Sequence, residues 1–217
     1  MKVGTDGVLL GAWTQVEEKN RVLDIGAGTG LISLMLAQRS DADIDAIEID
    51  LDAQKDCLFN FQQSIWKDRL RLYSCSLDEF LRNNPLNLYD LVVSNPPYFN
   101  PNNNSSARDI ARSQNQLSFK DLLKASFKVS NSLGELAVII PFQSLIEFSK
   151  LAIGCGWYVS RITNVKGKKE GKVSRSLLLL KKVKCETKEN EICIELEERH
   201  HYSEEYIKLL KDYLTIF

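Results

Sequence analysis

Histidine is almost absent from this 217-residue chain. Only His200 and His201 occur, side by side after an acidic stretch. Histidine is the commonest metal ligand in proteins and the usual general base of catalytic triads. The scarcity argues against a histidine-based metal site and against most triads, so we expect no bound metal. The adjacent pair is interpreted as a solvated surface feature.

Cysteine is also sparse and irregularly spaced. The chain contains five cysteines, an odd number, and none of them forms a C-x-x-C pair. Zinc sites and disulfide frameworks need paired cysteines at defined spacings. This pattern therefore argues against both.

Long apolar runs and a large net charge are missing as well. No run is long enough to cross a bilayer, and the first residues lack the pattern of a signal peptide. We therefore expect a cytoplasmic protein. Because the net charge is only −1, any binding of nucleic acid must come from a local basic patch.

What the chain does contain is a regular alternation of apolar strand-like runs and helical patterns, which predicts an α/β fold with a mostly parallel sheet and helices on both faces. The last two strands have no helix between them and must be antiparallel. We expect one domain over residues 1–217, in which Thr5 or Asp6 caps the first helix and residues 203–216 form the last. The chain begins directly at a functional-looking segment, which leaves open whether residues precede Met1. The expected strands are residues 21–25, 44–49, 70–75, 88–95, 135–140, 157–165 and 176–183.

A proline-rich turn follows the fourth expected strand. Asn95 offers a side-chain carbonyl, and Pro96 keeps its backbone carbonyl although it has no N–H. Two acceptors one peptide apart suit an amino group with two hydrogens. Tyr98 and Phe99 add flat apolar faces, so an exocyclic amino group on a planar base is the natural ligand. The simpler alternative is a structural turn.

Three glycines separate the first strand from the next helix. Gly26, Gly28 and Gly30 allow a ligand to approach the backbone closely, as in dinucleotide-binding folds, but they stand one residue short of that fingerprint. Asp24 would repel a pyrophosphate and attract an ammonium group, directly or through water. Glu48, at the end of the second strand, can accept from ribose hydroxyls. Together they favour S-adenosylmethionine, although a helix-terminal anion and an exposed strand end are the structural alternatives.

These motifs resemble a known superfamily. Residues 22–30 are similar to the cofactor loop of class I S-adenosylmethionine-dependent methyltransferases, and the likeness extends from residue 22 to about 183. Residues 95–98 resemble the Asn-Pro-Pro-Tyr motif of amino-methyltransferases that act on adenine N6, guanine N2 or protein glutamine. Residues 2–13 resemble the tRNA1(Val) adenine-N6-methyltransferase family. That family has a Rossmann-like, seven-stranded sheet ending in an antiparallel pair.

The resemblance implies N6-methylation of adenine in tRNA, with S-adenosyl-L-methionine as donor and S-adenosyl-L-homocysteine as product. Asn95, Pro96 and Tyr98 would be catalytic, and Pro97 and Phe99 would bind the substrate with Tyr98. We expect a monomer. The alternatives are a glutamine N5-methyltransferase acting on a protein such as a release factor, another RNA or DNA amino-methyltransferase, and an RNA-binding module without catalysis. The expected cofactor-binding residues are Thr5, Asp24, Gly26, Gly28, Gly30, Glu48, Ile49, Ser76 and Asn95, where Ser76 stands at a position that is acidic in many relatives.

A basic cluster surrounds the turn between the last two expected strands. A lysine-rich turn is often only a solvated surface, but this one contrasts with a chain of net charge −1. We expect it to bind RNA phosphates, chiefly through Lys168, Lys169 and Lys172. The cluster comprises Lys166, Lys168, Lys169, Lys172, Arg175, Lys181, Lys182 and Lys184.

Overall fold

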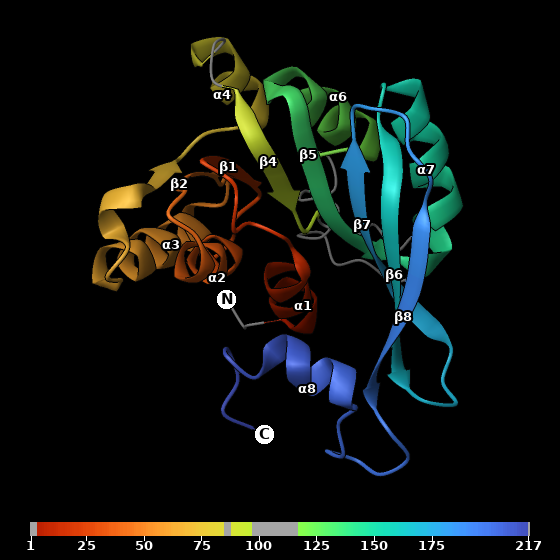
Figure 1. Cartoon of the computed structure of the whole chain (residues 1–217). Helices are drawn as coiled ribbons and strands as arrows, with labels where there is room; N and C mark the ends of the chain where they lie inside the picture. The colour runs from red at the N-terminus through yellow and green to blue at the C-terminus, as the bar shows by residue number, and fades with distance from the viewer. Residues whose placement is uncertain (1–3, 85–87, 97–116, 217) are drawn as a thin grey trace, which may run out of the picture.

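The computed structural model describes residues 4–84, 88–96 and 117–216 (Figure 1). Its α-helices are α1 (Thr5–Trp13), α2 (Leu31–Arg39), α3 (Leu51–Gln63), α4 (Leu77–Asn83), α6 (Phe119–Val129), α7 (Leu145–Gly154) and α8 (Glu204–Leu210). Its strands are β1 (Arg21–Ile25), β2 (Asp43–Ile47), β3 (Leu70–Tyr73), β4 (Tyr89–Ser94), β5 (Ser130–Pro141), β6 (Tyr158–Lys168), β7 (Val173–Lys181) and β8 (Lys188–Glu195). Short 3-10 turns, η1 (Lys67–Arg69) and η2 (Phe142–Ser144), precede β3 and α7.

The strands form one sheet in the order β3-β2-β1-β4-β5-β7-β6-β8. Strands β1 to β5 are parallel to one another, and β7 runs antiparallel to both β5 and β6. The predicted α/β fold with an antiparallel C-terminal pair is therefore confirmed. Because β6 is antiparallel to β7, it points the same way as β5, so the β6–β7 turn lies at the edge where the parallel strands end.

Two apolar layers cover the two faces of the sheet, as the period of two in each strand requires. In β7, Leu177 and Leu179 pack with α1, α2, α3 and α8, whereas Leu178 and Leu180 pack with α4, α6 and α7. Figure 1 shows these helices on opposite sides of the sheet. All four leucines are buried, which explains why this strand reads as a continuous apolar run.

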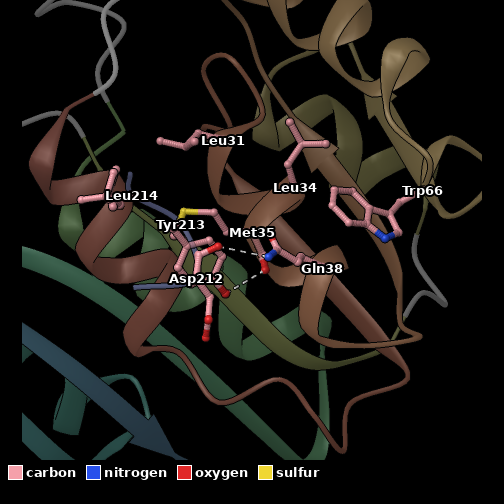
Figure 2. Close-up of a pocket in the computed structure, with 9 residues that line it drawn as sticks. Leu31, Leu34, Met35, Gln38, Trp66, Asp212, Tyr213 and Leu214 are labelled. Atoms are coloured by element: carbon pink, nitrogen blue, oxygen red, sulfur yellow. Dashed lines mark hydrogen bonds between the residues drawn. The ribbon is translucent and has the colours of Figure 1, made fainter. Parts of the chain in front are cut away.

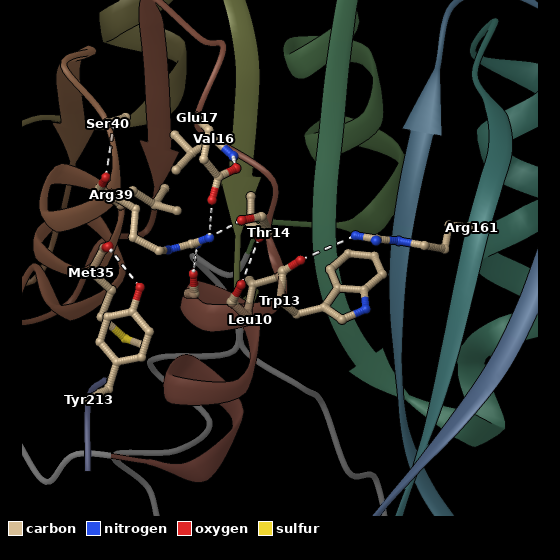
Figure 3. A network of polar contacts seen from close by, with 12 residues as sticks. Leu10, Trp13, Thr14, Val16, Glu17, Met35, Arg39, Ser40, Arg161 and Tyr213 are labelled. Carbon is tan, nitrogen blue, oxygen red and sulfur yellow. Dashed lines mark hydrogen bonds and ion pairs between the residues drawn. The ribbon is translucent and has the colours of Figure 1, made fainter. Parts of the chain in front are cut away.

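Helix α1 is held by side chains from distant parts of the chain (Figure 3). The Arg39 guanidinium of α2 donates to the carbonyl oxygens of Gly11 and Thr14, at 2.7 Å each. From the other side, the Arg161 guanidinium of β6 lies 3.8 Å from the centre of the Trp13 ring. Helix α1 is therefore fixed against both α2 and the C-terminal strands.

The structure departs from the sequence-based prediction at three places. The N-cap of α1 is Gly4, with no side-chain cap, so the prediction of a Thr5 or Asp6 cap is wrong; the Asp6 carboxylate instead accepts a hydrogen bond from Arg175 Nε at 2.8 Å. An unpredicted strand, β8, pairs in parallel with β6 at the sheet edge. The helix predicted over 203–216 ends at Leu210.

Within the ranges that the structure describes, no helix has the length and apolar character needed to span a membrane.

Candidate active site

The candidate site lies where β1 and β4 end side by side at the centre of the sheet. After β1 the chain enters α2 on one face, whereas α6, the next described helix after β4, covers the other face. The connections thus diverge between two neighbouring parallel strands. Open α/β sheets bind ligands at such a topological switch point, outside the carboxyl ends of the strands.

The glycine loop makes a tight turn at the end of β1. Gly26, Gly28 and Gly30 all have positive φ, at 75°, 59° and 79°, a region that side chains with a Cβ rarely adopt. The N–H groups of Gly26 and Ala27 donate to the Ile47 carbonyl at 2.9 and 3.0 Å, which ties the loop to β2. A Cβ on Gly30 would lie 2.5 Å from the Phe61 ring, whereas one on Gly26 would meet no atom of the described residues within 4 Å. The loop therefore packs on α3 at Gly30 and leaves space at Gly26.

Asp24 is completely buried at the end of β1. Its Oδ2 accepts a 2.7 Å hydrogen bond from the Ser33 hydroxyl of α2, while its buried Oδ1 has no hydrogen-bond partner among the described residues. Burial raises the pKa of Asp24 to about 7; the Ser33 side chain and backbone N–H oppose this rise, and the Glu48 carboxylate adds to it. The predicted acid is thus present with one acceptor atom unused.

Glu48 directly follows β2 and is 8% exposed. Its Oε2 accepts from the Gly28 N–H at 2.7 Å, and its Oε1 accepts from the N–H groups of Ile49 and Asp50 at 2.9 and 2.8 Å. This carboxylate therefore also braces the glycine loop, a role that the sequence did not indicate. Each carboxylate oxygen has two lone pairs, so Oε2 keeps capacity for one more donor, such as a ribose hydroxyl.

Three further residues of the predicted cofactor site lie at or near this edge. Ile49 follows Glu48 and is 57% exposed. Ser76 follows β3 and caps α4, accepting from the Glu79 N–H at 3.2 Å. Thr5 is exposed at the first position of α1. The start of α1 lies close to the glycine loop, because a Cβ added at Gly7 would lie 3.6 Å from Leu31, the residue after Gly30.

Asn95 and Pro96 follow β4 directly. Asp24 is in register with Val93, and the Ser94 hydroxyl donates to the Ile25 carbonyl at 2.8 Å, so Asn95 follows β4 beside the start of the glycine loop. Asn95 is partly buried and Pro96 is buried. The other predicted substrate residues, Pro97, Tyr98 and Phe99, lie outside the described residues, as do residues 2 and 3 of the opening motif.

The basic cluster of the β6–β7 hairpin separates into two groups. Four members are engaged within the fold: Lys166 with Glu191 at 3.0 Å, Arg175 with Asp6 at 2.8 Å, Lys181 with Glu135 at 3.0 Å, and Lys182 with the carbonyl oxygens of Phe127 and Ser130 at 2.7 Å each. The other four, Lys168, Lys169, Lys172 and Lys184, are exposed. The three lysines predicted to contact RNA all belong to the exposed group.

A cavity of about 430 Å³ lies elsewhere, between α2, Trp66 and the chain after α8 (Figure 2). Its lining is mostly apolar, with Leu34, Met35 and Leu214 among the contributors. None of the predicted cofactor or substrate residues that the structure describes lines it. Among the described residues, no group of three His, Cys, Asp or Glu side chains is placed to hold a metal ion.

One residue of the site escaped the sequence analysis. Ser33 is fully buried on α2, between Ile32 and Leu34, and reaches back nine residues to Asp24. The available signal was a hydroxyl at a buried position of a helix. The partner of that hydroxyl could not be read from the spacing.

The fold and this arrangement define a class I, S-adenosylmethionine-dependent methyltransferase: a Rossmann-like sheet with a glycine loop that follows an acid, and a second acid at the end of the neighbouring strand. The model of the methyltransferase small domain family matches residues 4–140. The tRNA1(Val) (adenine(37)-N6)-methyltransferase of Flavobacterium johnsoniae is 45% identical over 218 residues, covering 98% of this chain and 92% of its own length. The protein of the same name from Bacteroides fragilis is 40% identical over 215 residues, covering 98% and 90%. The chain therefore belongs to the methyltransferase small domain family.

Solved structures show the same fold at much lower identity. A protein described as a predicted O-methyltransferase from Agrobacterium tumefaciens superposes with a TM-score of 0.73 at 16% identity, covering 95% of this chain and 96% of its own. A methyltransferase from Pyrococcus furiosus gives 0.57 at 20% identity, with 80% of each chain covered. At these identities the likeness concerns the fold alone.

Proposed function

We propose that this protein transfers a methyl group from S-adenosylmethionine to N6 of an adenine in tRNA. The observation that carries the proposal is the position of Asn95 and Pro96, directly after β4 and beside the glycine loop at the switch point. The tRNA1(Val) (adenine(37)-N6)-methyltransferases of Flavobacterium johnsoniae and Bacteroides fragilis support the choice of tRNA and adenine.

The residues at the loop fit the proposed cofactor. Within the described parts of the chain, Asp24 provides a buried oxygen without a hydrogen-bond partner and Gly26 has open space beside its backbone, while Glu48 keeps acceptor capacity. These features match an ammonium group, a closely approaching chain and a ribose hydroxyl, and neither acid favours a phosphate. When bound, S-adenosylmethionine supplies an electrophilic methyl group on a sulfonium that is already a good leaving group.

The residues after β4 would orient the amino group. The Asn95 side-chain oxygen and the Pro96 carbonyl would accept the two N6 hydrogens and so hold the nitrogen in line for transfer. The adenine must leave its base stack to reach them. Tyr98, with Phe99, would stack on the extruded base, a contact worth about 1–3 kcal/mol. No covalent enzyme intermediate is needed in this scheme.

The exposed lysines of the β6–β7 hairpin would contact tRNA phosphates. The hairpin extends past β5, which ends at Pro141 opposite Arg175, and its turn lies at the same edge of the sheet as Asn95. Lys168, Lys169 and Lys172 are all exposed there. We further propose that residues 1–217 act as one domain and as a monomer, without a metal ion, in the cytoplasm where tRNA is modified.

The test is a mass-spectrometric assay of the purified protein with S-adenosylmethionine. Unmodified tRNA, tRNA carrying a single adenine substitution, and a protein pool containing release factors are incubated in parallel. We expect a gain of one methyl group on a tRNA nucleoside that co-elutes with N6-methyladenosine. Methylation of protein glutamine with no change in tRNA would overturn the proposal in favour of the alternative enzyme.

A further inference from the structure

The hydrogen bond between Ser33 and Asp24 links two completely buried side chains. The Ser33 hydroxyl donates to Asp24 Oδ2 at 2.7 Å, and both residues have no exposed surface. The second carboxyl oxygen, Oδ1, is the one without a partner among the described residues. The contact therefore uses one oxygen of the acid and leaves the other for a ligand.

Ser33 behaves differently from Thr14 and Ser126, two other buried hydroxyl side chains in or directly after helices. Serine and threonine at such positions commonly bond to a carbonyl of the preceding turn. Thr14 donates to the Leu10 carbonyl and Ser126 to the Leu123 carbonyl, at 2.7 and 3.1 Å. Ser33 instead spans from α2 to β1, so its hydroxyl serves the acid rather than its own helix.

The surroundings otherwise disfavour an ionised Asp24. Burial disfavours the charge, and the Glu48 carboxylate after β2 repels it. Cys57 of α3 is a further titratable group that interacts with Asp24, and its thiol is buried. Burial is the main cause that raises the pKa of this thiol to about 12, so the thiol stays neutral. Among the described residues, Ser33 is thus the one whose hydrogen bonds favour the ionised form of Asp24.

We propose that Ser33 is a positioning residue for cofactor binding, whose hydroxyl favours the ionised form of Asp24 and leaves Oδ1 available to the ammonium group of S-adenosylmethionine. This inference rests on the proposed function, because it assigns that ammonium to Asp24. A hydroxyl donor that is lost from a buried carboxylate makes ionisation harder, and the cofactor must then bind a site that is more often protonated.

The experiment measures the affinity of S-adenosylhomocysteine by calorimetry from pH 5.5 to 9 in the native protein and in Ser33→Ala. A hydrogen bond to a charged group corresponds to about one to two pH units. We therefore expect the midpoint of the affinity profile to move up by that amount. Affinity at pH 7 should fall about five- to fifty-fold, and the difference should shrink to about threefold or less at pH 9.

Two further variants separate this effect from a loss of packing. Ser33→Thr keeps the hydroxyl and should restore the native midpoint. Ser126→Ala removes a buried helix hydroxyl that bonds only to backbone, and it should leave the midpoint unchanged. If Ser33→Ala binds cofactor too weakly for calorimetry, the ¹³C shift of the Asp24 carboxyl, followed against pH in the ligand-free protein, gives the same midpoint directly. A shift equal in Ser33→Ala and Ser126→Ala, or an unshifted midpoint, would overturn the proposal.

Asp24→Asn distinguishes this inference from the proposed function. Loss of both affinity and pH dependence in Asp24→Asn, with an unshifted midpoint in Ser33→Ala, would overturn only the role of Ser33. Native affinity in Asp24→Asn would overturn the assignment of the ammonium to Asp24, on which both depend.

Discussion

Two charged regions lie at the same edge of the sheet, and they differ in how the protein surrounds them. Asp24 and Glu48 are buried at the ends of β1 and β2, and hydrogen bonds hold both carboxylates. Lys168, Lys169 and Lys172 are exposed at the turn of the β6–β7 hairpin. The buried pair faces a low dielectric, in which each interaction is strong; the lysines face water, in which each is weak and screened by salt.

The difference predicts how each region responds to change. In the buried region, the loss of a single polar atom should be enough to change binding, and binding should depend on pH. At the hairpin, only several lysines together should matter, and salt should be the sensitive variable. The expected effects below run from the largest, beside the buried region, to the smallest, within the basic cluster.

Asn95→Ala should have the largest effect. It removes one preorganised acceptor at the reacting nitrogen, which costs on the order of 10²–10³ in rate. We expect kcat with tRNA to fall by that factor while calorimetry still detects cofactor binding, because the other expected cofactor-binding residues remain. Asn131→Ala is the matched control, because Asn131 binds Asp90 at 2.6 Å, away from the site. Normal turnover by Asn95→Ala would remove this residue from the mechanism.

Asp24→Asn should change binding and stability in opposite directions. Losing a charged partner of an ammonium should weaken cofactor affinity at pH 8 by about ten- to hundred-fold. The folded-state pKa of Asp24 is about 7, above its usual 3.8. The contribution of this group to the free energy of unfolding is therefore fully present below pH 4, and it is lost as the pH rises to 7, because the unfolded chain gives up the proton first. The amide has no such loss. Thermal unfolding of the ligand-free proteins should therefore show Asp24→Asn gaining stability relative to native between pH 4 and 8; a constant difference would contradict the raised pKa.

The sequence was sufficient for the region around the glycine loop. Short segments rich in apolar residues specify β1, β2 and β4, and the parallel order then brings Asp24, Glu48 and Asn95 to one edge. The structure adds the short-range contacts that a pattern does not contain. The bond from Ser33 to Asp24 depends on how α2 packs against β1, and the bond that Glu48 accepts from the Gly28 N–H depends on the φ values of the loop.

The hairpin and the C-terminal region were less predictable for a different reason. Strand β8 lies at the sheet edge, and Ile192 is its one buried residue, the others being exposed or partly buried, so it has little apolar periodicity. The acids that engage the basic cluster lie far away in sequence, as Asp6 does for Arg175 and Glu135 for Lys181. Charge density predicted the cluster, but only the fold separates its engaged members from the exposed ones.

Changing Lys168, Lys169 and Lys172 together to Ala should reduce the salt dependence of tRNA binding. Each lysine that neutralises a phosphate contributes about 0.7–0.9 to the slope of log K against log salt, so the slope should become shallower by about 2. Filter binding at several salt concentrations measures it, with cofactor affinity expected to be unchanged. The control changes three other exposed lysines, Lys67, Lys128 and Lys150. Equal loss of slope in both triple variants would show that any surface lysines suffice.

The smallest effect on tRNA binding is expected within the basic cluster itself, at Lys182. Its ammonium donates to the carbonyl oxygens of Phe127 and Ser130 and lies 4.2 Å from the centre of the Phe127 ring. These bonds serve the C-terminal end of α6, where a cation favours the orphan carbonyls. Lys182→Met keeps an apolar stem but removes the ammonium. We expect a loss of about 1 kcal/mol in the free energy of unfolding, measured by urea denaturation, and no change in tRNA affinity or its salt slope. If Lys182→Met instead lowered the salt slope as much as the loss of one exposed lysine of the β6–β7 turn does, the RNA contact would extend along β7. The division of the cluster into engaged and exposed members would then not describe its function.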